Sequence, residues 1–103
     1  MFDFQKLAVY KKAKEFNLEV NRLNPRKKFD NISSDQLCRA SWSIPLNIAE
    51  GSGRFSNADR KNFFVISRSS VFESVSILEN LYDLNKIEID KYEYFESLGE
   101  EIL

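Results

Sequence analysis

The chain has 103 residues, a length typical of one domain, and its 15 Lys and Arg residues nearly balance its 16 Asp and Glu residues. Histidine is absent and Cys38 is the only cysteine, which excludes an internal disulfide, a multi-cysteine zinc site and the commonest general base. No apolar run approaches the ~20 residues of a membrane span, and the first residues carry no signal-peptide pattern, so we expect one cytoplasmic domain over residues 1–103.

The first predicted helix runs from about Asp3 to Leu23. Its apolar residues are spaced four, three, four and three apart, which is typical of helices that pack along a seam. They are Val9, Ala13, Phe16, Val20 and Leu23. We expect the helix to stop before Pro25, because a residue that precedes proline is pushed out of the helical region. A short basic loop over residues 26–29 follows.

The second predicted helix begins at Ser33 or Ser34, where a hydroxyl can cap free backbone amides. It runs to about Glu50 and ends at the Gly-Ser-Gly sequence of residues 51–53, since glycine is favoured just past a helix end. Pro45 lies inside this helix, removes one hydrogen bond and crowds the preceding turn, so we expect a kink there. Two separate helices broken at Pro45 are the alternative.

The third predicted helix begins after Ser56, which forms a capping box with Asp59 in place of the usual glutamate. It continues to about Leu84, an unusual length for a small domain. Ser67, Ser70 and Ser74 follow one side of this helix, and small side chains let a neighbouring backbone approach closely. The serine row therefore predicts a packing seam.

The last predicted helix begins near Asp90 and carries a short apolar stripe that includes Tyr92, Phe95 and Ile102. No alternating strand pattern or hairpin turn occurs anywhere in the chain. The expected fold is therefore all-α: an antiparallel up-down four-helix bundle with short loops, a long third helix and a kinked second helix.

The second helix carries two different stripes. An apolar stripe that includes Leu37, Ile44 and Ile48 lies about 100° from a row of polar residues, because residues three or four apart share a helix face. We call this row the polar ribbon; it consists of Gln36, Arg39, Ser43, Asn47 and Glu50. An ordinary surface helix does not need such an ordered row. The ribbon therefore predicts a helix buried on two sides, with polar groups paired across a second interface.

Carboxylates are candidates for catalysis, but no histidine base stands with Glu50, Asp59 or Glu73. Cys38 could be a reactive thiol, but we expect a small residue in or near the core instead. We expect Glu50 and Glu73 to pair with arginines instead, because a guanidinium holds a carboxylate through two parallel bonds. The candidate partners are Arg39, Arg54 and Arg68. Together with Arg54 and Glu73, the polar ribbon is expected to set the register of helices and subunits. No enzyme activity, cofactor, metal or small-molecule substrate is predicted.

Charge is distributed unevenly, with 13 Lys and Arg against 7 Asp and Glu in residues 1–68, and 2 against 9 in residues 69–103. Acidic late helices that lie against basic early ones explain this pattern, and so does a basic surface for nucleic acid. The candidate nucleic-acid contacts are Lys11, Lys14, Arg22, Arg26, Lys27 and Lys28. No helix-turn-helix, zinc-finger or RNA-recognition motif accompanies them.

The block from Gln36 to Arg54 resembles a sequence pattern of the 23S ribosomal-RNA intervening-sequence proteins, a four-helix-bundle family. The resemblance extends over nearly the whole chain, although Ser69 stands where the family usually has glycine. The matching residues are Phe4, Leu7, Gln36, Arg39, Ala40, Ser43, Ile44, Asn47, Ile48, Ala49, Glu50, Gly51, Gly53, Arg54, Phe63, Ser70 and Glu73.

This resemblance implies an up-down four-helix protomer that assembles into a ring-shaped homopentamer, and it supplies no catalytic residues. Related accessory proteins of diversity-generating retroelements are similar barrels that bind nucleic acid and a reverse transcriptase. Two hypotheses for function therefore stay open. The first is a non-enzymatic, self-associating scaffold or accessory factor, and the second is a nucleic-acid-binding accessory protein.

Overall fold

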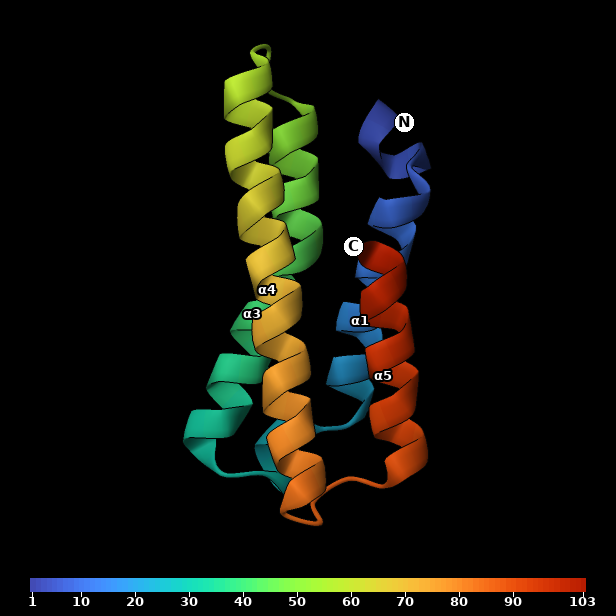
Figure 1. The fold of residues 1–103 in the computed structure, drawn as a ribbon, viewed down its shortest axis with the longest axis vertical. Coiled ribbons are helices and arrows are strands. Elements are labelled where there is room, and N and C mark those ends of the chain that lie inside the picture. Colours follow the sequence, from blue (N-terminus) through green and yellow to red (C-terminus); the bar gives the residue numbers. More distant parts are fainter.

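The computed structural model describes all 103 residues and is all-helical, which confirms the predicted four-helix bundle. Four long helices run alternately up and down in a molecule of 44 × 22 × 21 Å (Figure 1). The elements are a 3₁₀ helix η1 (Asp3–Lys6), α1 (Ala8–Arg22), the short α2 (Pro25–Lys28), α3 (Asn31–Ser52), α4 (Asn57–Asp83) and α5 (Ile89–Ile102). Helix α1 packs against α3 and α5, and α4 packs against the same two helices.

The first predicted helix is in fact two elements, because Leu7 is extended, with φ −68° and ψ 131°. Gln5 turns back to accept a hydrogen bond from the Phe2 N–H at 2.7 Å, which closes the 3₁₀ turn. The break lets the Phe4 ring meet Tyr10 edge-on, with centroids 5.0 Å apart. In one continuous helix these two side chains would point about 120° apart, because each residue turns by about 100°.

The predicted basic loop at residues 26–29 is also wrong, since residues 25–28 form the single turn α2. Asn24 takes the left-handed conformation, with φ 56°, and Pro25 then occupies the first helical position, where its fixed φ fits and its missing N–H costs nothing. The next helix begins earlier than predicted, at Asn31. Asp30 caps it by accepting a hydrogen bond from the Ser33 N–H at 2.8 Å, and this bond lowers the pKa of the Asp30 carboxyl.

Helix α3 continues through Pro45 and is bent, so the predicted kink is confirmed and the two-helix alternative is wrong. Helix α4 begins as predicted, with the Ser56 hydroxyl accepting a hydrogen bond from the Asp59 N–H at 3.1 Å. It ends at Asp83, and Asn85 then turns the chain with a φ of 59°.

The serine row of α4 forms the predicted seam with α3, because Ser67, Ser70 and Ser74 are all buried. The Ser67 hydroxyl donates to the Ile44 carbonyl at 2.9 Å. The Ser70 hydroxyl lies 2.9 Å from that of Ser43. Small side chains therefore bring the two helices close enough for hydrogen bonds between them.

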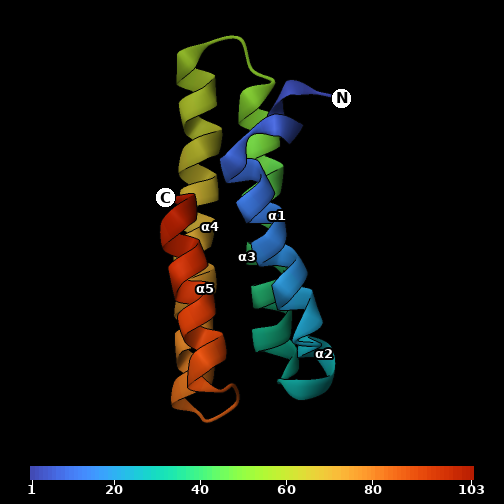
Figure 2. The ribbon, with the colours of Figure 1, turned by 90° about the vertical axis from the view of Figure 1, so that its right-hand side faces the viewer.

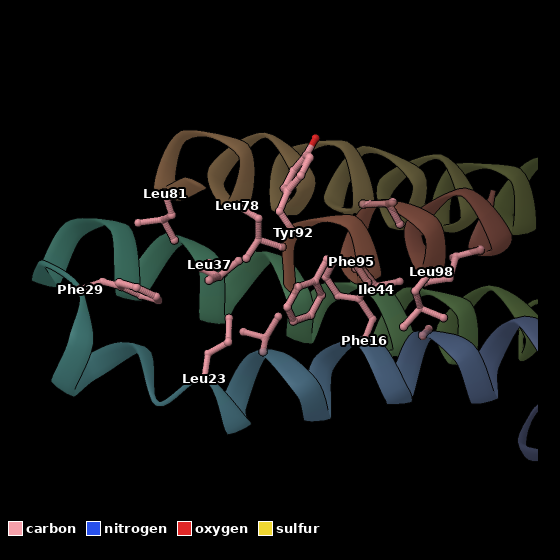
Figure 3. Close-up of a cluster of buried hydrophobic side chains, with 14 of the residues drawn as sticks. Phe16, Leu23, Phe29, Leu37, Ile44, Leu78, Leu81, Tyr92, Phe95 and Leu98 are labelled. Carbon is pink, nitrogen blue, oxygen red and sulfur yellow. The ribbon is translucent and has the colours of Figure 1, made fainter. Parts of the chain in front are cut away.

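The core lies where all four long helices meet (Figure 3). Phe16 of α1 and Phe95 of α5 pack edge to face, with ring centroids 5.2 Å apart, and both are essentially inaccessible to solvent. Leu37 and Ile44 of α3 and Leu78 of α4 belong to the same core and are also fully buried. Each comes from the apolar stripe of its own helix, as the spacing predicts.

Candidate functional site

The polar ribbon lies on α3 beside its contact with α4. Ser43 and Asn47 in its middle are half-buried, and the Asn47 amide donates to both the carbonyl and the hydroxyl oxygen of Ser43, at 2.8 Å each. Ser70 of α4 reaches the same hydroxyl. The middle of the ribbon is therefore tied to the neighbouring helix, within one chain.

The ends of the polar ribbon differ from its half-buried middle, because Gln36, Arg39 and Glu50 are exposed. A single chain thus covers only one of the two sides that the sequence predicts to be buried. Glu50 pairs with Arg54 at 3.1 Å, as the sequence predicts, but both side chains are about half exposed. Arg54 also lies over the Phe63 ring, 4.5 Å from its centroid.

Arg39 and Glu73 have no oppositely charged partner within the chain. Glu73 lies one turn from Ser70 on α4, on the side of that helix that meets the polar ribbon. The structure therefore does not form the intramolecular arginine pair predicted for Glu73. One unpaired positive and one unpaired negative side chain remain on neighbouring helices.

Exposed apolar side chains accompany these charges. Trp42 is 58% exposed and Leu46 is 46% exposed, and they lie one turn apart on α3. Ile66, one turn before Ser70 on α4, is also exposed. We define the α3–α4 face as Arg39, Trp42 and Leu46 of α3 with Ile66 and Glu73 of α4. Sequence reasoning missed Trp42, although its position three residues after Arg39 places an aromatic ring beside the ribbon.

Carboxylates lie among the basic residues proposed as nucleic-acid contacts. Lys11, Lys14 and Arg22 follow α1, but Glu15 and Glu19 line the same shallow depression. Arg22 forms an ion pair with Glu19, and Arg26 of α2 pairs with Asp35 of α3 at 2.8 Å. Lys27 and Lys28 lie in α2, between α1 and α3, where they are exposed and pair with no carboxylate.

Other reactive groups are few. No group of three or more His, Cys, Asp or Glu side chains is arranged to hold a metal ion. Cys38 is a free, half-buried thiol on α3. The Tyr92 hydroxyl lies 3.0 Å from a Glu96 oxygen and 3.3 Å from a Glu79 oxygen. Burial and these two carboxylates raise the pKa of Tyr92 well above its ordinary value.

These features define a small all-α bundle with a polar ribbon that is half-buried in its middle and exposed at its ends. None of its helices has the length and apolar character to cross a bilayer. The chain belongs to the 23S rRNA-intervening sequence protein family, whose sequence profile matches residues 5–103.

A similar solved structure is a protein of unknown function from Bacteroides thetaiotaomicron VPI-5482, assigned to the S23 ribosomal protein family. It is 26% identical, with a TM-score of 0.85 over 92% of this chain and 91% of that chain. A comparison with curated proteins finds no significant match.

Proposed function

We propose that this protein is a non-enzymatic scaffold or accessory factor that works as a homo-oligomer, assembled through the α3–α4 face. The observation that carries this proposal is the exposure of Trp42 and Leu46 directly beside the unpaired Arg39. Protein interfaces are enriched in aromatic residues and arginine, and tryptophan and arginine carry a large share of their binding energy.

The two unpaired charges, Arg39 on α3 and Glu73 on α4, are suited to a head-to-tail interface between subunits. In a ring, each subunit presents one patch to the next subunit and a different patch to the previous one, and here these are the α3 side and the α4 side of the α3–α4 face. Arg39 of one subunit can then pair with Glu73 of its neighbour while the apolar side chains are buried around them. The family resemblance favours a closed ring of five subunits.

The stoichiometry is tested by size-exclusion chromatography with light scattering. The wild type should elute as a pentamer, and Trp42→Glu should reduce it to smaller species, because a charge would then be buried in the interface. Ile32→Glu is the matched control, since Ile32 is also exposed on α3 but lies outside the α3–α4 face. A monomeric wild type, or a Trp42→Glu variant of unchanged mass, would refute the proposal.

The proposed ion pair is tested by reversing its charges. Arg39→Glu and Glu73→Arg should each weaken the assembly, because each places like charges opposite one another. The double variant should restore assembly in large part, since the pair is then re-formed in reverse. If the double variant is no better assembled than either single variant, the two residues do not meet across the interface.

Nucleic-acid binding is the second candidate, and the unpaired Lys27 and Lys28 favour it. The acidic residues among Lys11, Lys14 and Arg22 weigh against a long phosphate-binding track. Binding through lysines should fall steeply as salt rises and should be lost in a Lys27→Glu, Lys28→Glu variant. Gel retardation with RNA and DNA at low salt decides this, and no retardation would end the proposal.

A further inference from the structure

An apolar cleft opens where α5 ends. Helix α5 has 14 residues and α4 has 27, so at about 1.5 Å per residue α5 covers about half the length of α4. Figures 1 and 2 show α5 ending beside the middle of α4, while the start of α1, the end of α3 and the start of α4 continue past it. The cleft there has a volume of about 290 Å³. Its apolar lining consists of Leu7, Val9, Ile48, Phe64, Ile102 and Leu103.

The mouth of this cleft is positively charged. Arg68 of α4 lines it and has no carboxylate partner. A shallow depression beside it shares Phe64 and Arg68 and is also lined by Arg60 and Lys61. No acidic residue lines either the cleft or the depression. An anion at the mouth would therefore meet the cationic side chains of Arg60, Lys61 and Arg68 and no Asp or Glu side chain.

The interior of the cleft offers little to a polar molecule. Ser67 is its only other polar residue, and the Ser67 hydroxyl already donates to the Ile44 carbonyl. A ligand must therefore be apolar over most of its length and anionic at one end. The volume is close to the lower end of the roughly 300–1,000 Å³ that small-molecule sites occupy, and bundles commonly place such sites between facing helices.

We propose that this cleft binds a small amphipathic anion, a medium-length hydrocarbon chain that ends in a carboxylate. The chain lies between the start of α1 and the start of α4, and the carboxylate lies against Arg68. Trp42, Leu46 and the other residues of the α3–α4 face do not line the cleft. The proposal is therefore independent of self-association, and either can fail alone.

The first experiment titrates the isotope-labelled protein with decanoate, below the concentration at which decanoate forms micelles, and follows amide resonances by NMR. We expect saturable binding at one site per chain, with the largest shifts at residues around Val9, Ile48 and Phe64. Decyltrimethylammonium has the same chain with the opposite charge and should bind at least about tenfold more weakly. The absence of saturable decanoate binding, or equal binding of the two probes, would overturn the proposal.

Variants then locate the site. Arg68→Gln should weaken decanoate binding about tenfold and remove the preference for the anion, because the charged hydrogen bond is lost. Arg26→Gln is the matched control, since Arg26 lies on α2 and lines neither the cleft nor the depression. Val9→Phe should fill the cleft and abolish binding, with circular dichroism to verify the fold. Leu103→Trp, at the exposed end of α5, serves the same purpose without touching the core.

Two results of these variants would refute the site. One is decanoate binding that Arg68→Gln and Leu103→Trp leave unchanged. The other is a drop in the mass of the oligomer when the cleft is filled, with no decanoate bound by the wild type. That second result would mean that another copy of the chain occupies the cleft.

Discussion

The close contact between Gly51 and α4 gives the sharpest stability prediction. A Cβ atom added to Gly51 would lie 2.7 Å from Cε1 and 2.9 Å from Cδ1 of Phe64, and 3.2 Å from Cβ of Phe63. The Phe64 ring is 42% exposed and can swing away in part. The Phe63 Cβ is fixed to the α4 backbone, so the two helices must separate slightly to admit Gly51→Ala.

Two effects oppose each other in this variant. Overpacking of this kind costs about 1–3 kcal/mol. Replacing glycine by alanine within a helix returns up to about 1 kcal/mol, because alanine loses less backbone entropy on folding. We therefore expect Gly51→Ala to lower the free energy of unfolding by about 1 kcal/mol, given that Phe64 can yield.

Gly53→Ala is the matched control, two residues later. An added Cβ there would lie 3.6 Å from its nearest neighbour, which is ordinary contact, and the residue has a φ of −85° that alanine adopts readily. This variant should be stabilised by about 0.4–1 kcal/mol, because its unfolded chain has fewer conformations to lose.

Urea unfolding at one fixed protein concentration measures both variants, since assembly makes apparent stability depend on concentration. The expected difference between them is about 1.5 kcal/mol, which corresponds to a shift in Tm of about 6–12 °C for a domain of this size. If Gly51→Ala proves as stable as Gly53→Ala, the close approach of α3 and α4 at this point does not limit packing, and the reasoning fails.

Two further predictions concern polar groups within the fold. Ser74 is fully buried and its hydroxyl has no hydrogen-bond partner, so Ser74→Ala should raise the free energy of unfolding by about 1 kcal/mol, measured by urea unfolding. A loss of stability in this variant would mean that the Ser74 hydroxyl forms a hydrogen bond in solution. Burial and nearby carboxylates raise the pKa of Tyr92 above its ordinary value of about 10, so folding favours the neutral phenol. The resulting stability is fully present below pH 10 and is lost as pH rises from there towards the folded-state pKa. Tyr92→Phe should therefore flatten the decline in stability above pH 10, and an unchanged slope would show that other groups cause it. Tyr94, whose pKa is also raised, should retain part of the slope in this variant.

The sequence predicts those parts of the fold that depend on local patterns. The apolar spacing locates the four long helices, Pro45 locates the bend, and the serine row locates the α3–α4 seam. Local rules fail where two signals compete within a few residues. Asp30, Ser33 and Ser34 are all good caps, and in the structure Asp30 caps α3 while the Ser34 hydroxyl donates to the Pro25 carbonyl.

The candidate surfaces were harder to predict, because they depend on which helices meet. The polar ribbon is visible in the sequence, yet Glu50 pairs with Arg54 while Arg39 pairs with nothing in the chain. The cleft beside Arg68 combines side chains from α1, α3, α4 and α5, which lie up to 96 positions apart from Leu7 to Leu103. No spacing rule brings such distant residues together.

The short α5 also makes the two ends of the bundle unequal. Near Phe95, each long helix has two neighbours, whereas the first turns of α4 beyond Ile102 rest mainly on α3. Segments with fewer packed neighbours open more often than the rest of a protein, without global unfolding. Local opening should therefore begin at the α3–α4 turn and stop near the level of α5. The packing of Phe16 against Phe95 should stay intact while that end of the bundle opens.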